Sequence, residues 1–161
     1  MEGLLAQSAP SVPVPVENMV TERGIELRYG DLEDVSGLLV RDADGVTIGV
    51  NSTHSPVRQR FTIAHEFGHF LLHEGILEHV DRGYRVNYRS ALSSEATDVE
   101  EIEANFFAAS ILMPRSYLDA RSAVLAVDDD TQVKALAQEF HVSQHAMSLR
   151  LANLYRQYAP Y

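Results

Sequence analysis

The sequence predicts an α+β fold, in which a small antiparallel three-stranded sheet packs on a pair of helices and further helices follow at the C-terminal end. Three observations favour it. Short β-prone runs occupy the first third of the chain, and long apolar segments with helical start and stop signals follow them. Hydrophobic residues make up 45% of the 161 residues, which is enough for a core. This length fits one domain, or one core with a small helical appendage.

The N-terminal part is expected to hold the whole sheet. Residues 1–13 are predicted to be a flexible lead-in, because prolines interrupt any helix there. A short helix over about 15–23 follows, and Gly24 is placed to end it. Asp44-Gly45 is a strong hairpin signal between the last two β-prone runs. The three runs of the predicted sheet are 25–29, 35–40 and 46–51.

The rest of the chain is predicted to be helical around one loop. Ser55-Pro56 has the pattern of a helix N-cap followed by proline at the first helical position. The polar, turn-rich stretch 81–98 is expected to be a mobile loop. We therefore expect a core over 14–127 and a helix-turn-helix-like segment over 128–161 that packs on it. The predicted helices are about 56–73, 99–113, 131–140 and 143–157.

Composition limits the classes of function. A formal net charge of −10 argues against sequence-independent binding of nucleic acid, which needs a basic surface. The chain has no cysteine, so a metal ion must be held by His, Glu or Asp. The N-terminus lacks the basic region and the apolar run of a signal peptide, and no stretch is long enough to cross a membrane. We therefore expect a cytoplasmic protein with no membrane association.

The motif His65-Glu66-Phe67-Gly68-His69 indicates metal-dependent hydrolysis. Residues four apart on a helix share a face, so His65 and His69 can bind one divalent ion. Glu66 lies to the side of that pair and is predicted to be the catalytic base for a water molecule. The structural alternative is two hydrogen-bonded histidines in a core helix. That alternative explains neither Glu66 nor Gly68.

A third protein ligand is needed. His73 lies one further turn along, but a helix drifts by about 40° every four residues, so three such histidines fan out. His73 is expected to cap or pack at the helix end. The metzincin pattern would need glycine at 72 and histidine at 75, whereas the chain has Leu72 and Gly75.

The better source is the second long helix, where three glutamates compete. Glu101 ranks first because it shares a face with small residues that would allow close approach to Gly68. Asn105, one turn on, is predicted to orient a ligating histidine. Glu100 and Glu103 rank behind, as acidic residues that suit a first helical turn. The resulting all-N/O site suits Zn²⁺, and Mn²⁺ or Fe²⁺ would also be accepted.

Two segments resemble the ImmA/IrrE family of metallopeptidases. They are residues 58–73, Arg-Gln-Arg-Phe-Thr-Ile-Ala-His-Glu-Phe-Gly-His-Phe-Leu-Leu-His, and Glu101-x-x-Ala104-Asn105-x-Phe107-Ala108 followed by Leu112-Met113-Pro114. The resemblance implies a zincin-like, gluzincin-type fold with Glu101 as the third metal ligand. It also implies site-specific cleavage of a helix-turn-helix transcriptional repressor encoded nearby, as an antirepressor in a phage, a mobile element or a stress response.

Two other functions compete with the peptidase. A metal-binding protein could sequester a repressor without cutting it. A helix-turn-helix regulator could bind DNA through the C-terminal helices, but Lys134, Arg150 and Arg156 there are opposed by Glu139 and by three aspartates just upstream.

For the peptidase, an extended substrate is expected to add a strand to the sheet's free edge. The candidates for an oxyanion donor are Tyr84, Tyr88, His141 and His145.

Overall fold

The computed structural model describes residues 11–75, 78–81 and 94–155. Two compact units divide the chain, one over Val16–Ala108 and the other formed by Ala109–Tyr161 with Met1–Pro15. The first unit contains the sheet and the helix that carries the histidine motif, so it is the part that positions the candidate site. The predicted boundaries at residues 13 and 127 stay a prediction.

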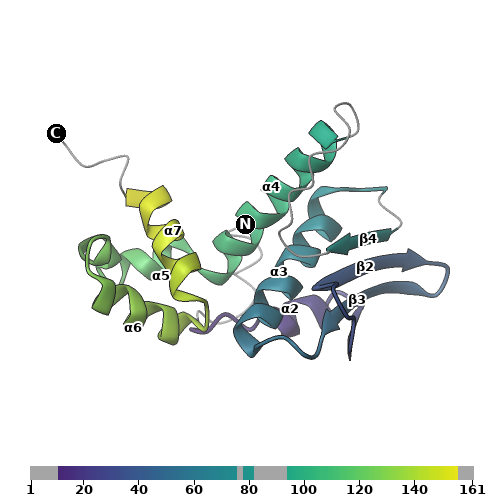
Figure 1. Ribbon diagram of the computed structural model, residues 1–161, viewed down its shortest axis with the longest axis horizontal. Helices are drawn as coiled ribbons and strands as arrows, with labels where there is room; N and C mark the ends of the chain where they lie inside the picture. The colour runs from purple at the N-terminus through teal and green to yellow at the C-terminus, as the bar shows by residue number, and fades with distance from the viewer. Residues whose placement is uncertain (1–10, 76–77, 82–93, 156–161) are drawn as a thin grey trace. The chain divides into compact units, whose positions relative to one another are not determined.

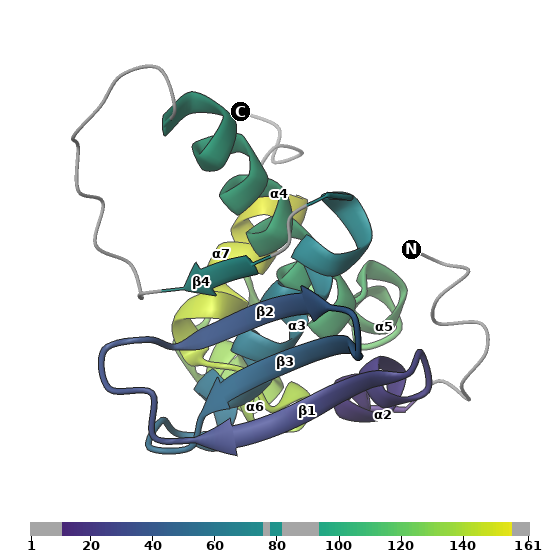
Figure 2. The same ribbon diagram turned by 90° about the vertical axis from the view of Figure 1, so that its right-hand side faces the viewer.

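The first unit is built on a four-stranded mixed sheet in the order β1-β3-β2-β4 (Figure 2). Strands β2 and β3 form the predicted antiparallel hairpin, β4 is antiparallel to β2, and β1 is parallel to β3. The strands are β1 (Ile25–Gly30), β2 (Gly37–Asp42), β3 (Gly45–Asn51) and β4 (Glu78–Asp81).

The α+β class is therefore confirmed, whereas the three-stranded antiparallel sheet is wrong in two respects. Strand β1 is parallel to its neighbour β3 instead of antiparallel, because the chain crosses over β3 before it enters β2. Asn51 binds the connecting segment. The Asn51 side-chain amide donates to the carbonyl oxygens of Glu33 and Val35, at 3.1 and 2.8 Å. Strand β4 comes after the motif helix, and its four residues carry too little alternation to be recognised in the sequence.

Helix α3 (Pro56–Leu72) carries the histidine motif and lies against β2 and β3 (Figure 1). It begins as predicted, since the Ser55 hydroxyl oxygen accepts from the Arg58 amide at 3.4 Å. At its other end the Arg41 guanidinium donates to the Phe70 carbonyl at 2.8 Å. The helix is thus anchored to the sheet at the end nearest His69. The preceding short helix α2 (Val16–Thr21) is followed by Gly24 at φ 76°, as expected for a terminating glycine.

Helix α4 (Ser94–Leu112) is longer than expected. The predicted loop was placed over 81–98, but the helix already begins at Ser94 and Asp81 belongs to β4. Residues 82–93 lie outside the described part of the chain. Because α4 begins early, Glu100 and Glu103 lie in its interior, and the explanation that they suit a first helical turn is wrong. The helix ends just before Pro114, as predicted.

The second unit contains the predicted C-terminal helices α6 (Asp130–Phe140) and α7 (Gln144–Tyr155). Asp129 caps α6, and the Ser143 hydroxyl oxygen accepts from the Ala146 amide at 3.0 Å. Two short elements, α5 (Arg115–Asp119) and the 3-10 helix η1 (Ala123–Ala126), were not predicted. None of the described helices combines the length and the apolar character needed to cross a membrane.

The sheet approaches α3 so closely at Gly37 that a side chain is excluded there. A Cβ atom at this position would collide with Thr62 of α3 and lie 3.4 Å from Cγ of Glu66. We expect Gly37→Ala to lower the free energy of unfolding by about 1–3 kcal/mol, the usual cost of overpacking. Urea denaturation measures this. Gly30→Ala is the matched control, because a Cβ atom there meets nothing within 4 Å. Equal effects of the two substitutions would contradict the prediction.

Candidate metal centre

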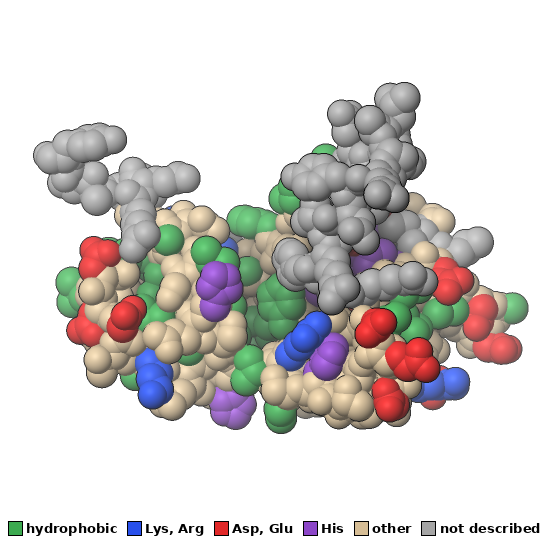
Figure 3. All heavy atoms as spheres, viewed as in Figure 1, with side chains coloured by type: hydrophobic (Ala, Val, Ile, Leu, Met, Phe, Trp, Pro, Cys, Tyr) green, Lys and Arg blue, Asp and Glu red, His purple; other side chains and the backbone are tan. Residues whose placement is uncertain are grey.

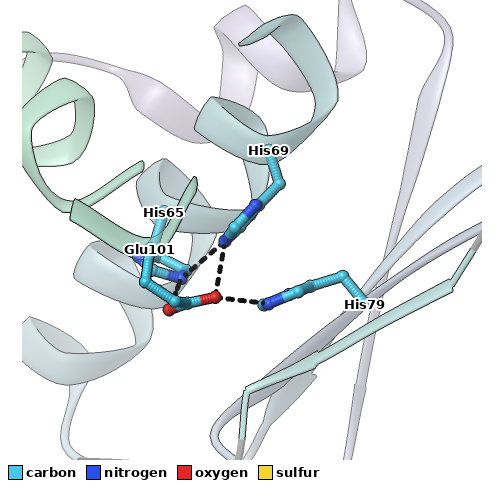
Figure 4. Close-up of side chains that lie close together, drawn as sticks. All are labelled: His65, His69, His79 and Glu101. Atoms are coloured by element: carbon cyan, nitrogen blue, oxygen red, sulfur yellow. Dashed lines mark hydrogen bonds and ion pairs between the residues drawn. The ribbon is translucent and has the colours of Figure 1, made fainter. Parts of the chain in front are cut away.

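The two motif histidines point to one place from adjacent turns of α3. Their Nε2 atoms lie 3.1 Å apart (Figure 4). His69 and Glu66 are fully buried, and His65 is 4% exposed. Buried polar groups cost free energy unless they are paired or coordinated. Three buried polar side chains on one helix are therefore unusual for a helix that only packs in a core.

Glu101 reaches the same place from α4. Its carboxylate oxygens lie 3.3 Å from Nε2 of His65 and 3.2 Å from Nε2 of His69. The approach depends on Gly68, because a Cβ atom there would lie only 3.2 Å from the Ala104 Cα and 3.1 Å from the Phe107 ring. This is the close contact between a glycine and a small residue that the sequence predicted.

His79 of β4 joins these residues and was missed by the sequence analysis. It pairs with the buried Leu39 of β2, and directly opposed residues of neighbouring strands point to the same face of a sheet. Its Nδ1 lies 3.0 Å from Oε2 of Glu66, and its Nε2 lies 2.7 Å from Oε1 of Glu101. Its ring stacks on that of His69 at 3.8 Å. The only signal in the sequence was a histidine between the motif and Glu101.

The spacing of the donor atoms fits a divalent ion. His65, His69, His79 and Glu101 each offer a ligand atom, and these atoms all lie within 4.8 Å of one another. Bonds of 2.0–2.1 Å in a tetrahedral zinc site put neighbouring donors about 3.3–3.4 Å apart. The separations of 3.1–3.3 Å among His65, His69 and Glu101 are close to this value. The 2.7 Å contact of His79 with Glu101 is instead a hydrogen-bond length.

Electrostatics hold the Glu101 carboxylate in its charged form. Burial raises its pKa, but the hydrogen bonds with His65, His69 and His79 outweigh burial and lower the pKa far below the usual range. Burial lowers the pKa of His79, whereas its hydrogen bonds to Glu101 and Glu66 raise it, and the net pKa is about 10. Burial is also the main cause of the lowered pKa of His69. The charged carboxylate and a neutral His69 are in the state that binds a metal ion, whereas the raised pKa values of His65 and His79 favour the charged forms of those two imidazoles.

The predicted outer partner lies behind the first histidine. Oδ1 of Asn105 is 3.1 Å from Nδ1 of His65, on the side of the ring away from Glu101.

His73 ends α3, and its backbone amide donates to the His69 carbonyl at 3.1 Å. It is outside the group of four, as expected, but its ring is in contact with His69. Glu103 contacts His73 and is outside the group of four.

The structure describes two of the four residues considered as oxyanion donors, His141 and His145. Tyr84 and Tyr88 lie outside the described residues. His141 ends α6 and His145 lies in α7, both in the second compact unit.

Comparison with protein-family models identifies the family of this chain. The family model described as the IrrE N-terminal-like domain, Peptidase M78, matches residues 20–152. The chain belongs to this family. Membership confirms the resemblance to ImmA/IrrE metallopeptidases and supports a function of the metallopeptidase type. The M78 match includes α3, β4 and α4, so it covers every residue of the cluster. A search of curated proteins found no match for this M78 member.

Proposed function

We propose that this M78 member is a metal-dependent endopeptidase in which His65, His69 and Glu101 hold the ion. The observation that carries the proposal is the convergence of three donor atoms, 3.1–3.3 Å apart, beside the buried carboxylate of Glu66. When bound, a divalent ion such as Zn²⁺, Mn²⁺ or Fe²⁺ would lower the pKa of a water molecule and polarise the scissile carbonyl.

Glu66 is the proposed base. Its Oε1 is buried and has no hydrogen-bond partner among the described residues, whereas its Oε2 is in contact with His79. One oxygen is thus held and the other is available to accept a proton. Glu66 would take the proton of the attacking water and pass it to the leaving amine.

His79 would act by positioning Glu66. We expect His79→Ala to lower kcat by about 10–100-fold, the loss typical of an outer hydrogen-bonding partner, and to leave the metal content unchanged. Steady-state kinetics and elemental analysis measure the two quantities. His145→Ala, which removes an exposed histidine of the other unit, is the matched control. Loss of metal from His79→Ala would make this residue a ligand.

The proposed substrate is a helix-turn-helix repressor, bound in extended form along β4. This rests on the family resemblance and on the position of β4 at the end of the sheet, with β2 as its partner among the described strands. A peptide added alongside β4 would run past His79. Backbone hydrogen bonds would then supply affinity, and alternate side chains would supply specificity.

The test is cleavage of a purified repressor encoded beside the gene for this chain, with Zn²⁺ or Mn²⁺ added. We expect site-specific cleavage that a chelator abolishes and that added metal restores. Stable binding of the repressor without cleavage would favour sequestration and contradict the peptidase.

The buried position of Arg150 argues against the DNA-binding alternative. Its Nε donates to the Met113 carbonyl at 3.2 Å, so one of the few basic residues of the C-terminal helices serves the core. On the face shown in Figure 3, the basic side chains described within either compact unit do not gather into a patch. We expect no salt-dependent shift of operator DNA by this chain in a gel-shift assay. A shift would contradict this view.

A further inference from the structure

A line of three side chains runs from the surface of α4 to the buried cluster. Glu103 Oε2 lies 3.0 Å from Nε2 of His73, and Nδ1 of His73 lies 3.1 Å from Nδ1 of His69. His69 in turn directs its Nε2 at Glu101 and His65. His73 is buried, whereas the side chain of Glu103 is 55% exposed.

With both imidazoles neutral, the carboxylate of Glu103 favours one direction for the hydrogen bonds between these three side chains. A carboxylate only accepts, so Nε2 of His73 must carry the hydrogen and donate to Glu103. A neutral imidazole carries one N–H, which leaves Nδ1 of His73 as an acceptor. Nδ1 of His69 then donates to it, and Nε2 of His69 presents its lone pair to the cluster. The Glu101 carboxylate lies 3.2 Å from that Nε2 atom and by itself favours the opposite tautomer, so Glu103 and His73 act against it.

We propose that Glu103 and His73 are positioning residues that fix the tautomer of His69 and thereby raise the affinity for the metal ion. The inference rests on the proposed metal-binding function. It gives a role to His73, which was expected to cap or pack at the helix end, and to Glu103, which was expected to suit a first helical turn. Without the line, His69 could carry its hydrogen on Nε2, and that tautomer cannot ligate from the side that faces Glu101.

The backbone keeps this line in place. The His73 amide donates to the His69 carbonyl at 3.1 Å, and the Arg41 guanidinium lies 3.5 Å from the His73 carbonyl oxygen. The His73 ring also lies 5.1 Å from the His69 ring, centroid to centroid. Removing Glu103 therefore changes the hydrogen bonding while the fold that positions His73 remains.

The experiment compares the metal-free wild type with Glu103→Ala and Glu103→Gln. Nitrogen-15 NMR of the imidazoles reports the tautomer of His69. Competition with a zinc chelator reports the dissociation constant. We expect wild type to hold His69 with its hydrogen on Nδ1, and Glu103→Ala to show a mixture of tautomers with Zn²⁺ affinity lowered about 10–100-fold. Glu103→Gln should largely restore both properties, because an amide oxygen can accept from His73.

Glu100→Ala is the matched control on the same helix and should change neither quantity. An unchanged His69 tautomer in Glu103→Ala would overturn the inference, as would an unchanged Zn²⁺ affinity. A wild-type protein that binds no Zn²⁺ would contradict the proposed function instead, and the tautomer measurement would still decide whether Glu103 and His73 position His69. A wild type that binds Zn²⁺ but cuts no repressor would leave the inference standing.

Discussion

Glu66→Gln should abolish proteolysis and leave the metal site filled. The substitution keeps the size of the buried side chain but removes its ability to accept a proton, and general base catalysis contributes about 10²–10⁴-fold to a rate. Glu66 contacts His79 rather than the two motif histidines or Glu101, so the three proposed ligands remain. The measurement is kcat/KM for the repressor, together with metal content by elemental analysis.

Glu100→Gln makes the same chemical change on α4, outside the group of four, and should retain full activity. Cleavage by Glu66→Gln at the wild-type rate would show that another group takes the proton. Loss of metal from Glu66→Gln would instead show that the buried carboxylate has a structural role in the site.

Glu101→Gln should lose the metal ion. The carboxylate is the only charged donor among the three proposed ligands, and an amide is a weaker ligand for Zn²⁺. We expect the affinity to fall by more than the 10–100-fold typical of an outer partner. The stabilisation that metal gives the folded state, about 2.7 kcal/mol at one hundred times Kd, should disappear as well. Elemental analysis and thermal unfolding with and without Zn²⁺ measure these effects.

The control for this prediction is Glu103→Gln, two residues along the same helix, which should keep its metal. The opposite pattern, with metal retained by Glu101→Gln and lost from Glu103→Gln, would make Glu103 the ligand. Loss of metal from both variants would show that the contact between Glu103 and His73 is as important for metal binding as the ligand Glu101.

Much of the arrangement near the motif could be predicted because it depends on local geometry. Helical periodicity alone places His65 and His69 on one face of α3, and the Ser55-Pro56 pair sets where that helix begins. The small residues that follow Glu101 indicated that α4 could come close to Gly68. The contact between Ala104 and that glycine agrees with this expectation.

The sequence by itself determined the fold class, the motif helix and the ranking of Glu101, since each follows from contacts within a few turns or from one helix face. Only the tertiary structure decided the partners that come from far along the chain. His79 enters the site because β4 pairs with β2. Strand β1 lies beside β3, and Asn51 of β3 binds the segment that connects β1 with β2. Strand pairing depends on long-range contacts, so a four-residue strand such as β4 carries no local pattern that predicts it.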